Sequence, residues 1–203
     1  MGIRIAVLAS GRGSNLLAIM QAITDGAIDG EIAVVLSDKE GAMALEHARK
    51  AGIPAYHVNP KAFADKSEYE AKLLEYIAQA DCQLICLAGY MRILSAYFVS
   101  NAPCPIMNIH PALLPSFPGL HGQKQALDYG VKVAGCTVHF VDEGTDTGPI
   151  IMQKAVEVKQ GDTPKELQQR VMEEAEWIIM PKAIDLIANG KVSVVDGQAV
   201  IAE

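Results

Sequence analysis

The chain has 203 residues, of which half are hydrophobic and a fifth are charged, and its formal net charge is -7 at pH 7. This composition excludes a disordered or low-complexity chain, and the length fits one domain with a substantial core. The acidic balance argues against nucleic acid as the main partner, because such binding depends on Lys and Arg residues that neutralise phosphates. We therefore expect a small-molecule ligand.

Cysteine spacing and hydropathy predict the compartment. The four cysteines, Cys82, Cys86, Cys104 and Cys136, lack the C-x2-C spacing of a metal or redox site. No apolar run approaches the roughly 20 residues that span a bilayer. The apolar segment from Ile3 to Ala9 is also too short for the core of a signal peptide. We expect a soluble cytoplasmic protein with no membrane segment and no metal.

The first half of the chain predicts strands that alternate with helices. The apolar run from Ile3 to Ala9 has the length of a strand, a glycine-rich segment follows from Ser10 to Asn15, and a helical stretch runs from Leu16 to Ile23. Further strands are predicted at residues 31–37, 54–58 and 84–88, and further helices at residues 42–51 and 67–79. This alternation predicts a doubly wound, mostly parallel sheet in an α/β fold, in which crossover helices cover both faces of the strands.

The second half predicts longer strands and a long C-terminal helix. The apolar segment at residues 105–109 is followed by a proline-rich loop, and we expect this loop to be mobile at residues 115–122. A short helix is predicted at residues 120–129. Strands at residues 134–141 and 150–158 are expected to extend the sheet edge. Thr163 to Glu166 form a capping box for a helix that runs to Ala188, with Pro181 as its candidate kink. Residues 192–195 and 198–201 predict a terminal hairpin.

The glycine-rich loop matches neither common nucleotide fingerprint. Counting from Gly11, Leu16 replaces the third glycine of G-x-G-x-x-G, and no Gly-Lys-Ser/Thr follows. The backbone N–H groups around Gly11 and Gly13, with Ser14 and Asn15 opening a helix, nevertheless favour a cradle for one phosphate. The alternative is a tight turn that only starts the helix.

Asn108, His110 and Asp146 form the candidate catalytic group. Asn108 and His110 are two positions apart on a predicted strand, so their side chains point to the same side. Asp146 lies in a Gly- and Thr-rich turn, where its carboxylate would favour the imidazolium form of His110. An amide and an imidazolium suit the stabilisation of an oxyanion. The alternative is a buried histidine that bonds to backbone.

Three other residues carry weaker signals. His139 alternates within a predicted strand, and Trp177 in the last helix is interpreted as packing. His121 either contacts phosphate or caps the following helix, and the cap is the simpler interpretation.

Four longer motifs together point to one enzyme family. They are Ser10 to Leu16, Leu87 to Leu94, Asn108 to Pro115, and Asp146 to Ile151. With these motifs the chain resembles the folate-dependent glycinamide ribonucleotide formyltransferases of purine synthesis. The resemblance covers residues 3–190 and implies the Rossmann-like formyltransferase fold.

The resemblance also implies the roles of individual residues. Asn108, His110 and Asp146 would be catalytic. The ribonucleotide contacts would be Gly13, Ser14, Asn15 and Glu176. The folate contacts would be Lys66, Met91, Arg92, Ile93, Leu94, Asn108, Asp142, Glu143, Gly144, Thr145 and Asp146.

The chain departs from the family at two of these places. Lys66 stands where the family has an arginine, so the charge stays but the bidentate fork is lost. The last helix reads Ala175-Glu176-Trp177 where the family commonly reads Ala-Glu-His, with one apparent extra residue upstream. Glu173 falls near a phosphate-contacting position, where an acid is unfavourable, and is left out of the site.

The resemblance implies one formyltransferase domain over residues 1–203, with a phosphate-binding half at 1–105, a folate and catalytic half at 106–190 and a hairpin at 191–203. The expected reaction transfers the formyl group of 10-formyltetrahydrofolate to the amine of glycinamide ribonucleotide, without metal, in a monomer or homodimer. The alternatives are a formyltetrahydrofolate hydrolase and a non-catalytic nucleotide-binding module. We also expect a cis peptide bond at Leu114-Pro115, where the chain must turn sharply.

Overall fold

The computed structural model describes residues 2–202 and divides into two compact units, Met1–Met107 and Asn108–Glu203. Seven strands form a mostly parallel sheet in the order β3-β2-β1-β4-β5-β6-β7, which confirms the predicted doubly wound α/β class. Their bounds are β1 (Ile3–Leu8), β2 (Gly30–Ser37), β3 (Ala55–His57), β4 (Leu84–Leu87), β5 (Ile106–His110), β6 (Val133–Phe140) and β7 (Ile150–Glu157). No helix within residues 2–202 has both the length and the hydropathy to cross a bilayer.

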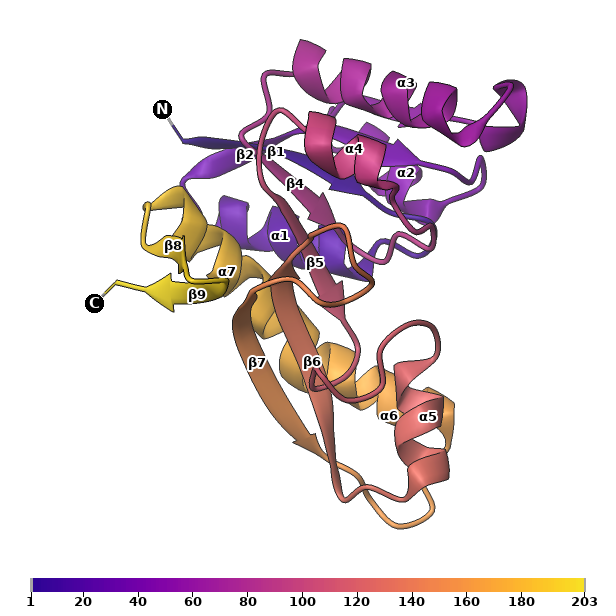
Figure 1. Cartoon of the computed structure of the whole chain (residues 1–203), viewed down its shortest axis with the longest axis vertical. Helices are drawn as coiled ribbons and strands as arrows, with labels where there is room; N and C mark the ends of the chain where they lie inside the picture. Colours follow the sequence, from indigo (N-terminus) through magenta and orange to yellow (C-terminus); the bar gives the residue numbers. More distant parts are fainter. Residues whose placement is uncertain (1, 203) are drawn as a thin grey trace. The chain divides into compact units, whose positions relative to one another are not determined.

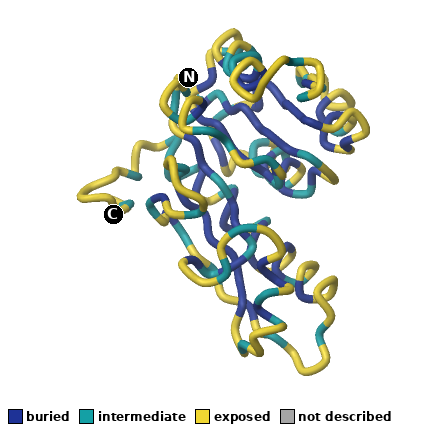
Figure 2. The backbone as a smooth tube through the Cα atoms, turned by 45° about the vertical axis from the view of Figure 1, so that its right-hand side comes forward, coloured by how far each residue is buried: buried dark blue, intermediate teal, exposed yellow. Residues whose placement is uncertain are grey.

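The first unit is built on parallel strands with helices on both faces. Strand β1 pairs with β2 and β4, and β2 pairs with β3, all in parallel. Strands β1 and β4 are buried along almost their whole length (Figure 2), because helices cover both faces. Helix α1 (Ser14–Thr24) covers one face and α3 (Lys66–Gln79) the other (Figure 1). Helix α2 (Met43–Lys50) follows β2.

Two short elements of the first unit escape the sequence analysis. They are the 3-10 helix η1 (Pro60–Ala62) and the helix α4 (Ala96–Asn101). Both begin with a side-chain cap, because Asn59 accepts from the N–H of Lys61 and Ser95 accepts from the N–H of Phe98. Elements of three and six residues are too short to show a helical period.

As far as it is described, the second unit contains an antiparallel pair, four helical segments and a separate hairpin. Strand β6 pairs antiparallel with β7, and helix α5 (Gly122–Tyr129) precedes them. The predicted start of this helix at residue 120 is wrong by two residues. His121 has φ +63°, a left-handed conformation that cannot belong to the helix, so the helix begins after it. Strands β8 (Val192–Val195) and β9 (Gln198–Ile201) form the predicted hairpin, with positive φ at Asp196 and Gly197 in the turn.

The long C-terminal helix has an interruption that differs from the predicted one. It comprises α6 (Pro164–Val171), the π-helical turn η2 (Met172–Glu176) and α7 (Trp177–Ala188). The capping box at Thr163 is confirmed. Helix α7 continues through Pro181, the predicted kink, and the departure from α geometry lies upstream of it. Pro181 has no N–H for the carbonyl of Trp177, which is the residue that follows the π turn.

The π turn keeps two rows of buried residues on one helix face. Val171 and Ala183 are both fully buried although they are 12 positions apart. An uninterrupted α-helix would separate their directions by about 120°. A π turn accommodates one extra residue, which reduces this angle to about 20°. The same holds for the buried pair Met172 and Ile184. The extra residue noted in the sequence is therefore absorbed at η2, where Glu176 stays buried.

Candidate active site

The glycine-rich loop connects β1 to α1 and presents the start of that helix. Gly13 is the N-cap of α1 with φ +75°, and a Cβ there would lie 2.8 Å from the Cα of Ala44. Both the backbone conformation and the close approach of α2 therefore require glycine. Ser14 and Asn15 are the first two residues of α1, so their N–H groups lie at the positive end of the helix.

Ser10 links this loop to the segment that follows β4. Its hydroxyl donates to Oδ1 of the buried Asp38 at 2.6 Å and accepts from the N–H of Met91 at 2.8 Å. The backbone N–H of Ser10 also donates to the carbonyl of Gly89. The carboxyl ends of neighbouring strands β1 and β4 thus carry two connected loops, which is where ligands bind in open parallel sheets.

Glu70 links Lys66 to the same segment. The carboxylate of Glu70 is buried, accepts from the N–H of Ser95 at 2.9 Å and from its hydroxyl, and lies 3.8 Å from Nζ of Lys66. The guanidinium of Arg92 lies 5.2 Å from the ring centroid of Tyr69. Lys66 is therefore linked through Glu70 to Ser95, the residue that follows positions 91–94, and Met91 and Ile93 are 62% and 70% exposed.

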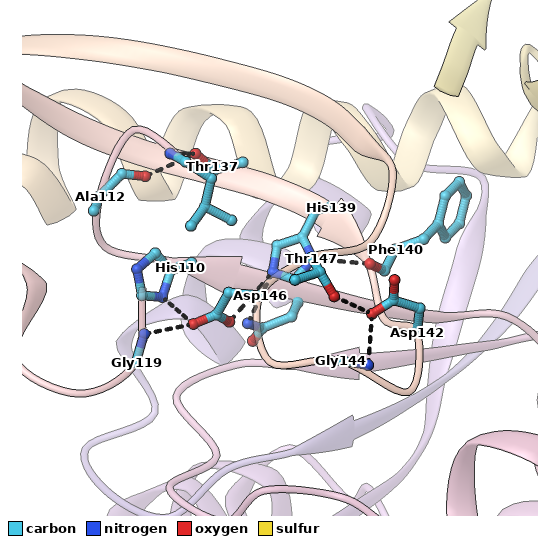
Figure 3. Close-up of polar contacts among 12 residues, drawn as sticks. His110, Ala112, Gly119, Thr137, His139, Phe140, Asp142, Gly144, Asp146 and Thr147 are labelled. Atoms are coloured by element: carbon cyan, nitrogen blue, oxygen red, sulfur yellow. Dashed lines mark hydrogen bonds and ion pairs between the residues drawn. The ribbon is translucent and has the colours of Figure 1, made fainter. Parts of the chain in front are cut away.

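In the second unit, Asp146 lies between two histidines (Figure 3). Oδ2 of Asp146 is 3.4 Å from Nδ1 of His110, and Oδ1 is 3.7 Å from Nε2 of His139. Oδ2 also accepts from the N–H of Gly119 at 2.8 Å. Asn108 donates from Nδ2 to Nε2 of His139 at 3.2 Å. The structure therefore brings Asn108, His110 and Asp146 together around His139, which the sequence analysis gave little weight.

The turn that holds Asp146 is fixed by its own hydrogen bonds. Asp146 has φ +56°, a left-handed conformation that aspartate tolerates better than most residues. Oδ1 of Asp142 accepts from the N–H of Gly144 at 3.0 Å and from the hydroxyl of Thr147 at 2.7 Å. A Cβ at Gly144 would collide with Thr147. The turn is thus preformed, and it directs the carboxylate at position 146 toward the histidines.

The geometry at His110 fits an imidazolium. Its Nε2 donates to the carbonyl of Phe117 at 2.8 Å, while Nδ1 faces the carboxylate of Asp146. Both neighbours are acceptors, so only the form with a proton on each ring nitrogen satisfies both. His110 is 4% exposed, and its charge is balanced by a carboxylate that is itself mostly buried.

Thr137 holds the base of the loop that contains Phe117. Its hydroxyl donates to the carbonyl of Ala112 at 2.7 Å and accepts from the N–H of Leu114 at 3.0 Å. Gln153 donates to the carbonyl of Leu114 at 2.8 Å. The Leu114-Pro115 peptide bond is cis, as predicted.

His139 lies at an irregularity of strand β6 that cannot be seen in the sequence pattern. The pairing of β6 with β7 shifts register between Val138 and His139, and such bulges redirect side chains next to active sites. The ring of His139 is 2% exposed, and its Nδ1 donates to the carbonyl of Phe140 at 2.8 Å. Burial lowers the pKa of His139 and outweighs the Phe140 bond and the nearby Asp146 carboxylate, which raise it.

The remaining candidates lie on the helices of the second unit. Glu176 is 7% exposed in the π turn, and its charge adds to burial in raising the pKa of the Cys136 thiol. The Glu176 carboxylate therefore lies near β6. His121 occupies the N-cap position of α5, but its side chain makes no cap bond, so that prediction is wrong. The indole N–H of Trp177 is buried without a partner in the described chain.

The predicted ribonucleotide contacts are divided between the units. Gly13, Ser14 and Asn15 belong to the first unit and Glu176 to the second. Within residues 2–202 no cluster of His, Cys, Asp and Glu side chains has the arrangement of a metal site.

Comparison with known proteins gives one consistent family. The family model described as Formyl transferase matches residues 3–184. Phosphoribosylglycinamide formyltransferase of Bacillus subtilis (strain 168) is 43% identical over 168 residues, covering 83% of this chain and 86% of that protein. The crystal structure of glycinamide ribonucleotide transformylase 1 from Symbiobacterium toebii has a TM-score of 0.97 at 48% identity, covering 100% of this chain and 95% of that one.

A second kind of relative is much longer than this chain. The trifunctional purine biosynthetic protein adenosine-3 of Drosophila pseudoobscura pseudoobscura is 49% identical over 189 residues. The match covers 92% of this chain and 14% of that protein. The chain thus spans about a seventh of the length of this relative.

Proposed function

Since the chain belongs to the formyl transferase family, we propose that it transfers the formyl group of 10-formyltetrahydrofolate to the primary amine of glycinamide ribonucleotide. The observation that carries the proposal is His110, whose two ring nitrogens both face acceptors, with Asp146 at one of them. A buried imidazolium next to an amide suits the oxyanion of acyl transfer. We choose glycinamide ribonucleotide as the substrate because the names of the B. subtilis and S. toebii relatives contain it.

The reaction proceeds by direct attack of the amine. The amine nitrogen forms a bond to the formyl carbon, and the carbonyl electron pair moves to oxygen, where His110 and Asn108 stabilise it. The bond from this carbon to N10 of the folate then breaks. Asp146 keeps His110 charged and relays the proton of the amine toward N10, with water as an intermediary. Proximity of the two substrates replaces a protein nucleophile.

We propose that the reacting oxygen binds where the carbonyl of Phe117 lies in this structure. This carbonyl is the acceptor that lies 2.8 Å from Nε2 of His110, the distance expected for a hydrogen bond to an oxyanion. When substrates bind, the formyl oxygen takes the place of this carbonyl, and the loop at residues 115–122 moves to release it.

The ribonucleotide phosphate binds at the start of α1. The N–H groups of Gly13, Ser14 and Asn15 supply the donors, and the helix end adds a favourable field. Glu176 accepts from the ribose hydroxyls.

The formylfolate contacts that we propose follow the family resemblance and are given for each unit by itself. Met91 and Ile93 expose apolar surface of the kind that a flat pterin covers, and Lys66 supplies a cation for the carboxylates of the folate tail. Arg92 and Leu94 are further proposed contacts in the first unit. In the second unit, the residues proposed to contact the pterin and its formyl group are Asn108, Asp142, Glu143, Gly144, Thr145 and Asp146.

All four thiols are free, which supports the cytoplasmic location that we propose. Burial raises the pKa of Cys82 to about 12 and of Cys104 to about 11, so neither forms a reactive thiolate near neutral pH.

An assay with each substrate in turn tests the proposal. The chain is incubated with 10-formyltetrahydrofolate, with and without glycinamide ribonucleotide, and both products are quantified. We expect tetrahydrofolate and formylated ribonucleotide in equal amounts, and neither product without the amine. Tetrahydrofolate released without the amine would indicate a hydrolase. Binding of ribonucleotide with no product under any condition would indicate a non-catalytic module.

A further inference from the structure

The two ring nitrogens of His139 have different partners, which defines its proton arrangement. Nδ1 lies 2.8 Å from the carbonyl of Phe140, which only accepts, so this nitrogen carries a proton. Nε2 lies 3.2 Å from Nδ2 of Asn108, which only donates, so this nitrogen is unprotonated and its lone pair accepts the hydrogen bond. His139 is therefore neutral, as its burial also favours.

The neutral ring fixes the amide of Asn108. An asparagine amide has two donor hydrogens and one acceptor oxygen, and rotation by half a turn exchanges them. Because Nε2 of His139 is an acceptor, it selects the orientation with the NH₂ group on its side. One of the two amide hydrogens is used in this bond, and the other is left for a substrate oxygen.

Because His139 is neutral, the carboxylate of Asp146 forms an ion pair with His110 alone. Asp146 has Oδ2 at 3.4 Å from His110 and Oδ1 at 3.7 Å from His139. A proton on Nε2 of His139 would point at the donor group of Asn108 and at Oδ1 of Asp146. The amide would turn over, and the carboxylate would be shared between two cations.

We propose that His139 is a positioning residue for formyl transfer, acting through Asn108: its unprotonated Nε2 orients the amide that donates to the reacting oxygen. The proposal rests on the proposed function, because it needs Asn108 to act on that oxygen. The charged groups near the ring of His139 shift its protonation in opposite directions. Asp146 and Asp142, from the turn after β6, favour its protonation, and His110 on β5 opposes it.

A double-mutant cycle tests the proposal. His139→Leu removes the acceptor and is expected to lower kcat about 10-fold to 100-fold, with both KM values little changed. His139→Gln offers an amide oxygen in place of Nε2 and recovers part of the loss. In the Asn108→Ala background, His139→Leu has almost no further effect on kcat, because the group it positions is absent. An equal factor in both backgrounds would overturn the proposal.

Val138→Ala is the matched control for packing. Val138 is the fully buried neighbour of His139 on β6, and its side chain has no polar atom that could join the hydrogen bonds of the cluster. This substitution leaves a cavity without touching the polar cluster. It is expected to lower Tm and to change kcat by the same small factor with Asn108 or with alanine at position 108.

Nitrogen-15 NMR of the imidazoles tests the proton arrangement without an activity assay. We expect a protonated Nδ1 and an unprotonated Nε2 at His139 at neutral pH. A protonated Nε2 would overturn the proposal even in an active enzyme. If the unmodified chain transferred no formyl group while the NMR result held, the proposed function would fail instead.

The pH profile gives a third measurement. Below the pH at which His139 gains its proton, kcat falls because the Asn108 amide is turned over. The glutamine side chain of the His139→Gln variant does not titrate in this range, so the acidic limb of its profile moves to lower pH. An unchanged acidic limb in this variant would contradict the role of the neutral ring.

Discussion

The two units of the molecule build their functional groups in different ways. In the first unit, the loop at residues 10–15 offers mainly backbone N–H groups at the start of α1, and its geometry depends on Gly13. In the second unit, the side chains of Asn108, His110, His139 and Asp146 converge from two strands and a turn. A backbone site tolerates changes of side chain but not of conformation, whereas a side-chain network depends on each polar atom.

The sharpest test of this contrast removes a charge from the network. His110→Ala and Asp146→Asn are each expected to lower kcat by about two to four orders of magnitude, because in the proposed mechanism the oxyanion loses its charged donor. Asn108→Ala should have a smaller effect in the same direction. Steady-state kinetics and circular dichroism should show lost turnover in a folded protein. Near-normal turnover in purified Asp146→Asn protein would contradict the role of its carboxylate.

The second test changes the backbone of the loop. Gly13→Ala forces a left-handed alanine against Ala44, which should lower the free energy of unfolding by about 1–2 kcal/mol. Because the substitution distorts the proposed phosphate cradle and not the proposed catalytic side chains, KM for the ribonucleotide should rise about tenfold with kcat nearly unchanged.

Gly11→Ala is the control in the same loop. Gly11 has no positive φ, and a Cβ there meets nothing within 4 Å. Chemical denaturation should therefore show a stability close to that of the unmodified chain. An equal loss of stability in both variants would show that the loop does not depend on the conformation of Gly13.

The same contrast explains what the sequence could predict. The alternation of apolar runs and helices predicts the parallel strands, and the capping box at Thr163 and the turn at Asp196 are local signals. Asn108 and His110 were found because they are two positions apart on one strand. His139 was underestimated because its role depends on a bulge and on partners from other segments. No local pattern encodes such partners.

The π turn is a second feature that local signals did not predict. Residues near Met172 have ordinary helix propensity, and the widened turn follows from the need to bury residues on both sides of it. The sequence showed one extra residue in this stretch, but not which turn absorbs it. Pro181 removes only one N–H from the helix, whereas the burial of the two rows of residues decides where the irregularity lies.

Single-residue deletions should show that this turn, and no other part of the helix, absorbs the extra residue. Glu174 is exposed within the π turn, so its deletion converts η2 into an α-helical turn while Val171 and Ala183 keep a common face. The Tm should change by only a few degrees. Deletion of Lys182, which is also charged and exposed, rotates Ala183 and Ile184 by about 100° relative to Met180 and should prevent folding. Because Glu176 keeps its buried face in the Glu174 deletion, KM for the ribonucleotide should stay within about twofold of the unmodified value. Similar losses of stability in both deletions would show that the π turn does more than preserve the helix register.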